Sequence, residues 1–300
     1  MSIFNCQFIC CRGNKLPGGL IVVDCHMHMV LDGDYWRAAM GRHEKEPDIP
    51  WIRKQLETYR DRGFTWLRDG GDRLGAGKAA RELAPEYGIT YRTPLSPLHF
   101  RGHYGGFIGT CFGDWKEYAA LVKKARADGG DFIKVMISGL MDFDRFGVLT
   151  EAPLTPEQIR MTVEIAHGEG MAIMLHANGA RTVEAAAEAG ADSIEHGAYL
   201  DTEALRAMKE ADCVWVPTLS TVGNLRGNGR FCEDAVRKIL ASALENVKTF
   251  AEMGGLLAPG TDAGAWAVPH GSVTEYELFS GIGIGPERLE PGIRMLQNKF

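Results

Sequence analysis

The sequence predicts a (β/α)8 barrel, a closed ring of eight parallel strands surrounded by helices. Three observations lead to this fold class: apolar runs alternate with amphipathic stretches, eight such runs occur, and 300 residues with 45% apolar content suffice for one large core. We therefore expect a single domain over residues 1–300, with an N-terminal extension at 1–18, a C-terminal tail at 280–300 and little or no accessory β-sandwich. The predicted strands cover residues 19–26, 64–69, 89–95, 131–138, 171–176, 192–196, 213–219 and 255–262.

The stretches between the predicted strands carry the end signals of helices. In residues 155–170, TPEQIRMTVEIAHGEG, Thr155 suits the N-cap, Pro156 the first turn and Gly170 the exit. The same scheme recurs at residues 180–190, 201–211 and 233–255. Strands that alternate with helices are parallel with right-handed crossovers, and eight such units close into a barrel. An open doubly wound sheet is the alternative, but it would have a glycine-rich phosphate turn after the first strand, where this chain has histidines.

The composition and charge of the chain indicate which kinds of molecule it binds. The formal net charge is -6 with acids and bases interspersed, which favours neither nucleic-acid binding nor a basic membrane helix, so we expect a small-molecule partner. Residues 1–15 have too short an apolar segment, and no basic leader, for a secretory signal or a membrane span. Seven cysteines without regular spacing favour free thiols in a reducing compartment, and we expect a cytoplasmic protein. The cluster of Cys6, Cys10 and Cys11 lacks metal-knuckle spacing.

The stretch VVDCHMHMV, residues 22–30, places two histidines at the end of the first predicted strand. Residues i and i+2 of a strand point to the same face, so Asp24, His26 and His28 project together, and in a barrel enzyme the carboxyl ends of the strands carry the chemistry. Buried imidazoles crowded at one place need a partner, and zinc takes nitrogen and oxygen ligands. A metal site is therefore predicted from the residues that end strands 1, 5, 6 and 8, namely His26, His28, His176, His196 and Asp262.

Lys134 lies in DFIKVMISG, where it alternates with the aliphatic residues Ile133 and Val135, so it is expected to point into the barrel. A protonated lysine beside divalent metals would be repelled, and must be neutralised or paired. Reaction with carbon dioxide would give a carbamate with two oxygens able to bridge two metals. The alternative is an ion pair of Lys134 with a nearby carboxylate, of which the candidates are Asp24, Asp262 and Glu195.

Five motifs, DCHMHM, DFIKVMISG, LHANG, SIEHGAYLD and PGTDAG, occur in an order that resembles the amidohydrolase superfamily of metal-dependent hydrolases, over residues 18 to about 279. The surrounding stretches GFTWLRDGG, GHYGGF and VPTLS are similar to the imidazolonepropionase-like branch, which includes Xaa-Pro dipeptidases and peptidases of dipeptides and N-acylated amino acids. The resemblance implies two divalent metal ions, most simply zinc. His26, His28 and Asp262 would bind one, His176 and His196 the other, with a carboxylated Lys134 bridging.

The resemblance also implies roles for residues around the metals. In that branch a histidine after strand 3 and a tyrosine after the strand 6 histidine contact the scissile group, and His103 and Tyr199 match those places. Metal coordination lowers the pKa of bound water towards roughly 7, so that a bridging hydroxide can attack the carbonyl carbon of an amide. Asp262 would act as the proton shuttle, first as base and then as acid.

Substrate recognition is the part that the sequence defines least. The loop STVGNLRGNGRF after strand 7 contains Arg226 and Arg230, which are candidates to clamp a substrate carboxylate. Arg101 and Arg181 are comparable candidates. Three tryptophans, Trp115, Trp215 and Trp266, either line a pocket or fill core gaps. The remaining histidines, His43, His99, His167 and His270, are expected to be structural or solvent-facing.

The most consistent function is hydrolysis of an amide or peptide bond in a dipeptide or N-acyl amino acid. A lactonase, esterase or cyclic-amide hydrolase would use nearly the same residues, and a non-catalytic metal-binding barrel is a further alternative. A mononuclear deaminase usually has a glutamate soon after the strand 5 histidine, where this chain has Ala177, Asn178 and Gly179. A decarboxylase on this scaffold has no support in the sequence. With little material for a sandwich, the barrel is expected to rely on a partner subunit, so a homo-oligomer is predicted.

Overall fold

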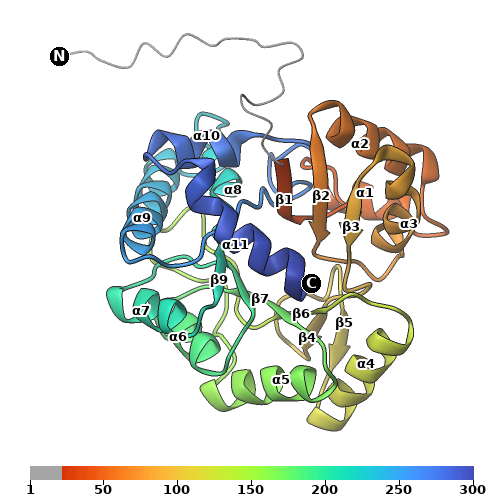
Figure 1. Cartoon of the computed structure of the whole chain (residues 1–300), viewed down its shortest axis with the longest axis horizontal. Helices are drawn as coiled ribbons and strands as arrows, with labels where there is room; N and C mark the ends of the chain where they lie inside the picture. Colours follow the sequence, from red (N-terminus) through yellow and green to blue (C-terminus); the bar gives the residue numbers. More distant parts are fainter. Residues whose placement is uncertain (1–21) are drawn as a thin grey trace.

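The computed structural model describes residues 22–300, which form a barrel of parallel strands surrounded by helices (Figure 1). The predicted fold class is confirmed. The extension at 1–18, the Cys6, Cys10 and Cys11 cluster and the start of the first predicted strand lie outside the described residues.

Seven of the eight predicted strands have a counterpart among the strands of the structure. All pairings between named strands are parallel, in the orders β1-β2-β3 and β5-β4-β6-β7-β8-β9. The strands are β1 Val22–Met27, β2 Phe64–Asp69, β3 Thr90–Arg92, β4 Leu98–Phe100, β5 Thr110–Phe112, β6 Ile133–Met136, β7 Ile173–Ala177, β8 Ser193–His196 and β9 Val214–Val216.

The third barrel strand is divided into two short pieces. β3 pairs with β2, whereas β4 pairs with β6, so the two pieces together join the two sheets. The predicted strand at 89–95 ends early because Pro94 has no N–H to donate and Leu95 has a φ of 66°. The sequence did not predict β4 and β5; β5 lies beside β4.

The eighth predicted strand, 255–262, closes the barrel without forming a regular strand. On one side the Trp215 N–H donates to Leu256 O at 2.9 Å, and on the other the Cys25 N–H donates to Pro259 O at 2.8 Å. The Asp262 N–H donates to His26 O at 2.7 Å. Isolated parallel bridges, Trp215 with Leu257 and Met27 with Ala263, therefore connect the segment to β9 and β1, while Pro259 has no N–H to extend the ladder.

The helices form the outer layer. The Thr155 hydroxyl accepts the Gln158 N–H, and the Gln158 side chain accepts the Thr155 N–H, so the predicted N-cap is confirmed as a capping box. Within residues 22–300, no helix combines the length and the apolar character needed to cross a membrane. The α-helices are α1 Trp36–Arg42, α2 Ile49–Asp61, α3 Ala76–Leu83, α4 Trp115–Ala127, α5 Pro156–Gly168, α6 Ala180–Glu188, α7 Thr202–Glu210, α8 Leu219–Gly223, α9 Glu233–Glu252, α10 Thr274–Gly281 and α11 Pro286–Lys299; a 3-10 turn spans Ala84–Tyr87.

Residues 280–300, expected to be a tail, mostly form α11, which lies across the amino ends of the strands (Figure 1). Lys299 Nζ lies 2.6 Å from Oδ1 of Asp192, the residue before β8, and the Phe300 ring packs against Phe132, just before β6. A Cβ on Gly292 would lie 2.2 Å from Leu257 O, so glycine permits the close approach of the helix. The segment therefore covers one end of the barrel.

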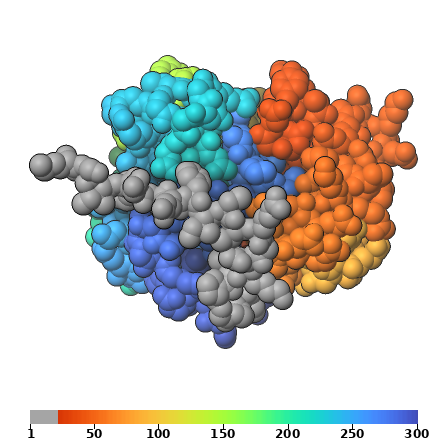
Figure 2. All heavy atoms as spheres, turned by 90° about the horizontal axis from the view of Figure 1, so that it is seen from above, coloured from red at the N-terminus to blue at the C-terminus, as the bar shows by residue number. Residues whose placement is uncertain are grey.

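The early and late parts of the described chain meet at the surface. Figure 2 shows them in orange and blue, side by side on one face. Arg62, at the end of α2, donates to Gly271 O at 2.7 Å, which joins the two parts next to the β1 side of the barrel.

Candidate metal centre

One cavity lies at the carboxyl ends of the strands, at the end of the barrel opposite α11. It has a volume of about 240 Å³. All the side chains that the sequence predicted as metal ligands line it, namely His26, His28, Lys134, His176, His196 and Asp262. The structure thus brings the predicted set together from β1, β6, β7, β8 and the closing segment.

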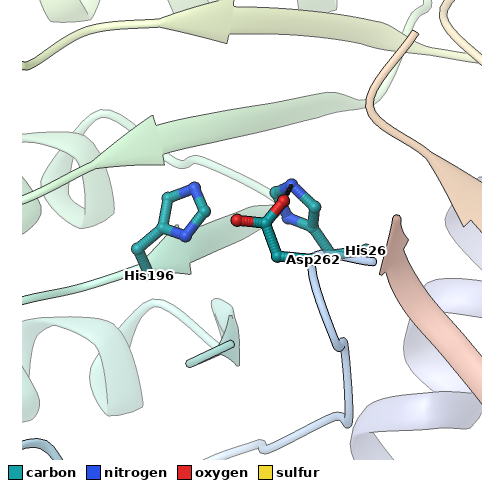
Figure 3. Close-up of side chains that lie close together, drawn as sticks. All are labelled: His26, His196 and Asp262. Atoms are coloured by element: carbon teal, nitrogen blue, oxygen red, sulfur yellow. Dashed lines mark ion pairs between the residues drawn. The ribbon is translucent and has the colours of Figure 1, made fainter. Parts of the chain in front are cut away.

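Three of these residues present their donor atoms to one another. The His28 Nε2 atom lies 3.3 Å from Asp262 Oδ1 and 3.3 Å from His26 Nε2, and His26 Nε2 lies 3.6 Å from Asp262 Oδ1. Figure 3 shows the Asp262 carboxylate facing His26, with His196 across from them. Atoms that each bind one zinc ion at about 2.0 to 2.2 Å lie roughly 3 to 3.5 Å apart, so the spacing suits a common ion.

His176 and His196 form a second pair beside the first group. Their ring centroids lie 4.5 Å apart, and the His196 ring lies 5.0 Å from His26. Ligand atoms of His26, His196 and Asp262 all lie within 4.8 Å of one another. The imidazoles and the carboxylate therefore form one continuous cluster.

Each of three histidines holds one ring nitrogen in a hydrogen bond away from this cluster. His26 Nδ1 lies 2.7 Å from Glu195 Oε2, His196 Nδ1 lies 2.8 Å from Thr218 Oγ1, and His176 Nε2 lies 3.2 Å from Gly139 O. Such contacts fix the orientation of a ligand ring and leave its other nitrogen free.

Glu195 is itself held in the middle of the barrel. It is fully buried, and Arg68 Nη2 donates to its Oε1 at 2.8 Å while Ser193 Oγ donates to the same atom at 2.7 Å. Arg68 also donates to Cys25 O at 2.7 Å. A buried carboxylate with this many partners is held in one place and can position the His26 ring.

The short helix α8 supplies hydroxyl groups to two members of the cluster. Thr218, just before the helix, contacts His196, and Thr221 Oγ1 donates to Asp262 Oδ2 at 3.3 Å. The helix is anchored by the buried Glu275 of α10, which accepts the Ser220 N–H at 2.7 Å and the Ser220 hydroxyl at 2.9 Å. The positions of the two hydroxyls thus depend on the contact between α8 and α10.

The backbone is unusual where the cluster residues leave their strands. His196 has a φ of 70°, Thr218 of 49° and Asp262 of 56°. Non-glycine residues rarely adopt this left-handed region, and such strain accumulates at functional sites. The cluster therefore lies on a backbone that the surrounding fold holds in place.

Gly70 allows His28 to lie where it does. A Cβ at this position would lie 2.2 Å from His28 Cε1 and 2.8 Å from its Nδ1. The Gly70 N–H donates to Met27 O at 2.7 Å, so the backbone cannot easily withdraw. Only a residue without a side chain fits beside this imidazole.

Lys134 makes no ion pair in the structure. Its Nζ atom is buried, and within the described residues it has no hydrogen-bond partner. Two of the three carboxylates considered as partners are engaged elsewhere, since Asp24 accepts the Thr261 hydroxyl at 2.6 Å and Glu195 pairs with Arg68. The third, Asp262, has an Oδ1 atom without a hydrogen-bond partner in the described residues, so it does not pair with Lys134 either. The predicted alternative of an ion pair is therefore not what the structure contains.

The donor set fits a divalent metal. Burial lowers the pKa of His26 and His196 well below 6.5 and that of His176 to about 3, so the three imidazoles are neutral, the form that binds metals. Asp262 Oδ1 is buried without a hydrogen-bond donor in the described part of the chain, and Lys134 Nζ is likewise unpartnered. Unpaired buried polar atoms are costly, and a bound divalent cation would satisfy the Asp262 oxygen, whereas a protonated Lys134 would be repelled by it.

The two residues predicted to contact the scissile group do not line the cavity. His103 is turned towards Glu151, with its Nδ1 3.6 Å from Oε1, and Tyr199 packs its ring 5.4 Å from that of Phe146. Tyr104 lines the cavity instead, with its ring 5.1 Å from that of His176. The structure thus places Tyr104, the residue that follows the predicted His103, at the cavity wall.

The predicted arginines also lie outside the cavity wall. Arg226 donates to Gly223 O at 3.3 Å within its own loop, and the exposed Arg230 stacks 4.4 Å from the ring of Trp266, which does line the cavity. Trp115 and Trp215 pack in the core. The comparable candidates Arg101 and Arg181 do not line the cavity either. The histidines expected to be structural or solvent-facing also lie outside its lining, namely His43, His99, His167 and His270.

Several residues of the site escaped the sequence analysis. Thr218, Thr221 and Gly70 act through contacts between distant segments, for which no local signal exists. Tyr104 had a signal, since it follows the singled-out His103 directly.

Comparisons with known proteins place the chain among hydrolases. The amidohydrolase family model matches residues 53–282. Ochratoxinase of Aspergillus niger is 25% identical over 320 residues, which cover 88% of this chain and 65% of ochratoxinase, so the chain spans less than two thirds of that relative. An uncharacterized Mycobacterium tuberculosis protein is 28% identical over 274 residues, covering 87% of this chain and 66% of that protein. A crystal structure of a Xaa-Pro dipeptidase with bound methionine has the same fold, with a TM-score of 0.73 and 20% identity over 92% of this chain and 75% of that one.

Proposed function

Because the chain belongs to the amidohydrolase family, we propose that it is a metal-dependent hydrolase that cleaves a carbon–nitrogen bond of a small-molecule amide. The observation that carries this proposal is the convergence of four histidines, a lysine and an aspartate on one cavity at the carboxyl end of the barrel. Active sites of such barrels lie at this end.

We assign His26, His28 and Asp262 to one divalent ion and His176 and His196 to a second, with zinc as the ion that suits nitrogen and oxygen donors. Such ions, when bound, polarise a carbonyl oxygen and lower the pKa of water towards neutrality. In support of the assignment, three histidines are already oriented by their contacts to Glu195, Thr218 and Gly139.

Lys134 is assigned as the bridging residue in its carboxylated form. Burial lowers the pKa of Lys134 to about 8, so a useful fraction of its amine is neutral near pH 7. The neutral amine adds to carbon dioxide, forms a C–N bond and releases a proton, which leaves a carbamate anion. This reaction replaces an unpartnered buried cation with an anionic oxygen donor.

Asp262 is assigned as the proton shuttle. Its Oδ1 has no donor in the described residues, while Oδ2 accepts the Thr221 hydroxyl. Asp262 takes the proton that the attacking water loses and returns it to the leaving nitrogen, so that an amide and water give an acid and an amine. Asp262→Asn should keep much of the metal and lower kcat about 10²- to 10⁴-fold.

Tyr104 is the hydroxyl that we place next to the substrate carbonyl. It lines the cavity beside His176, whereas His103 and Tyr199 do not reach the wall. Preorganised donors to a developing oxyanion contribute strongly to amide hydrolysis. Tyr104→Phe should therefore lower kcat with little change in metal content.

Dipeptides and N-acyl amino acids are the first substrates to screen, because the chain resembles a Xaa-Pro dipeptidase in fold and ochratoxinase in sequence. A lactone or ester would use the same residues and is separated from an amide only by turnover. The panel should therefore contain all three classes.

The deciding experiment is elemental analysis of protein purified with bicarbonate, comparing the parent with Lys134→Ala and with the exposed control Lys238→Ala. We expect about two metals per chain in the parent and the control, fewer in Lys134→Ala, and amide turnover only in the first two. One metal that does not depend on Lys134 would indicate a mononuclear deaminase or cyclic-amide hydrolase. Full occupancy without turnover across the panel would indicate a non-catalytic metal-binding barrel, and no metal would overturn the assignment.

A further inference from the structure

The wall of the cavity away from the ligand cluster is aromatic. Trp36, which begins α1, packs edge-on against Phe107 with ring centroids 5.3 Å apart. Phe143, from the loop after β6, lies 6.4 Å from Trp266, from the segment after the closing strand. Four segments that are distant in sequence thus contribute one ring each, so the aromatic wall forms only in the folded barrel.

The same wall offers little charge to a ligand. Apart from the predicted metal ligands, Asp34 is the one charged side chain that lines the cavity among residues 22–300. Arg230 lies outside, stacked on Trp266, with its Nη1 3.4 Å from Asp34 O. A carboxylate held against this wall would therefore lack a cationic partner and would lie near an acidic residue.

The size of the cavity sets the size of the group that can be held. A cavity of about 150 Å³ lined by apolar side chains takes up benzene. The volume of about 240 Å³ therefore accommodates one aromatic ring together with the atoms of an amide.

Resting on the proposed function, we propose that the substrate is a neutral aryl amide, whose ring lies against Trp36, Phe107, Phe143 and Trp266 and which carries no carboxylate next to that ring. Ring faces and edges attract one another, and the burial of apolar surface favours binding. The proposal narrows the substrate class, because it favours amides without a free carboxylate over free dipeptides and N-acyl amino acids.

A matched pair of compounds tests the charge requirement. Metal-loaded protein is assayed with acetanilide and with 4-acetamidobenzoate, each of which has one ring and one amide, and which differ only in one carboxylate on the ring. We expect kcat/KM to be at least tenfold higher for the neutral compound, and the dissociation constants, measured by calorimetry, to follow the same order. A preference for the carboxylate, above all one that disappears in Arg230→Ala, would overturn the proposal and favour an arginine clamp.

A matched pair of variants tests the wall. Trp36→Ala should raise the dissociation constant of acetanilide at least tenfold, whereas Tyr35→Ala, which alters an exposed neighbour outside the cavity, should change it less than twofold. Equal effects of the two variants would contradict the proposed ring position.

The binding readout separates this proposal from the proposed function. Binding of the neutral compound by metal-loaded protein, without hydrolysis of it or of any compound of the panel, would refute the hydrolase and keep the aryl site. Hydrolysis of aliphatic or anionic amides in preference to acetanilide would keep the hydrolase and refute the aryl site.

Discussion

Gly70→Ala should disable the candidate metal centre without changing any ligand. The added Cβ would lie 2.2 Å from His28 Cε1, 2.8 Å from its Nδ1 and 2.9 Å from its Nε2, so the whole edge of the ring is blocked. Gly70 does not have a positive φ, and alanine is therefore compatible with the backbone itself. The effect of the substitution is steric.

The size of the effect follows from these distances. Carbon atoms in contact stay about 3.5 Å apart, so the His28 ring must move by more than about 1 Å. Metal–ligand distances tolerate deviations of only about 0.2 Å. Since disturbing the residues around a ligand already costs about 10- to 100-fold in affinity, displacing the ligand itself should weaken metal binding at least about 100-fold, or roughly 2.7 kcal/mol.

The assay is competition for zinc with a chelator of known affinity, together with metal content after dialysis. Gly41→Ala is the control, because Gly41 lies within α1 and a Cβ there meets nothing within 4 Å. Circular dichroism checks that both variants are folded. If Gly70→Ala binds zinc as tightly as Gly41→Ala, His28 is not a ligand and the proposed centre is wrong.

Three further predictions concern stability. Burial lowers the pKa of His270 to about 4, so the unfolded chain binds more protons than the folded chain below pH 6.5. As the pH drops from 6.5 to 4, the unfolding free energy of the metal-free parent should therefore fall by about 3 kcal/mol more than that of His270→Gln. Equal pH dependence of the two proteins in urea titrations would contradict this. Arg68→Met leaves the buried Glu195 without its cation and should cost about 3 to 5 kcal/mol in urea unfolding, a loss below 1 kcal/mol being inconsistent with a buried pair. Gly292→Ala forces α11 away from Leu257 O and should cost about 1 to 3 kcal/mol, whereas Gly281→Ala, where a Cβ meets nothing within 4 Å, should be nearly neutral.

The alternation of strands and helices was predictable because its signals are local. The capping box at Thr155 and the alternating pattern around Lys134 depend on neighbours in sequence, and the structure has both. The three-residue strands β4 and β5 lie in a stretch rich in glycine and proline, where pairing partners far along the chain decide the conformation. These strands have no local signal.

The candidate site also contains some residues whose positions the sequence could predict and others whose positions it could not. Residues at strand ends, such as His176 and Asp262, could be placed because the ends of parallel strands converge. The direction of loop side chains could not: Glu151 Oε1 accepts the Tyr104 N–H at 2.6 Å and lies beside His103, so a distant carboxylate decides which of the two faces the cavity. The direction of the Arg230 side chain likewise depends on a residue distant in sequence, Trp266, on whose ring it stacks.

The contact between α8 and α10 gives a way to tune the site from outside. Glu275 holds Ser220 of α8, and the hydroxyls that contact His196 and Asp262 come from Thr218, just before this helix, and from Thr221 within it. Some residues between these helices, such as Gly223 and Leu278, do not line the cavity. These two residues lie close together, since a Cβ on Gly223 would lie 2.8 Å from Leu278 Cδ1. Variation at such positions can adjust the basicity of His196 and the orientation of Asp262 together, so that divergent catalysts could evolve on an unchanged ligand set.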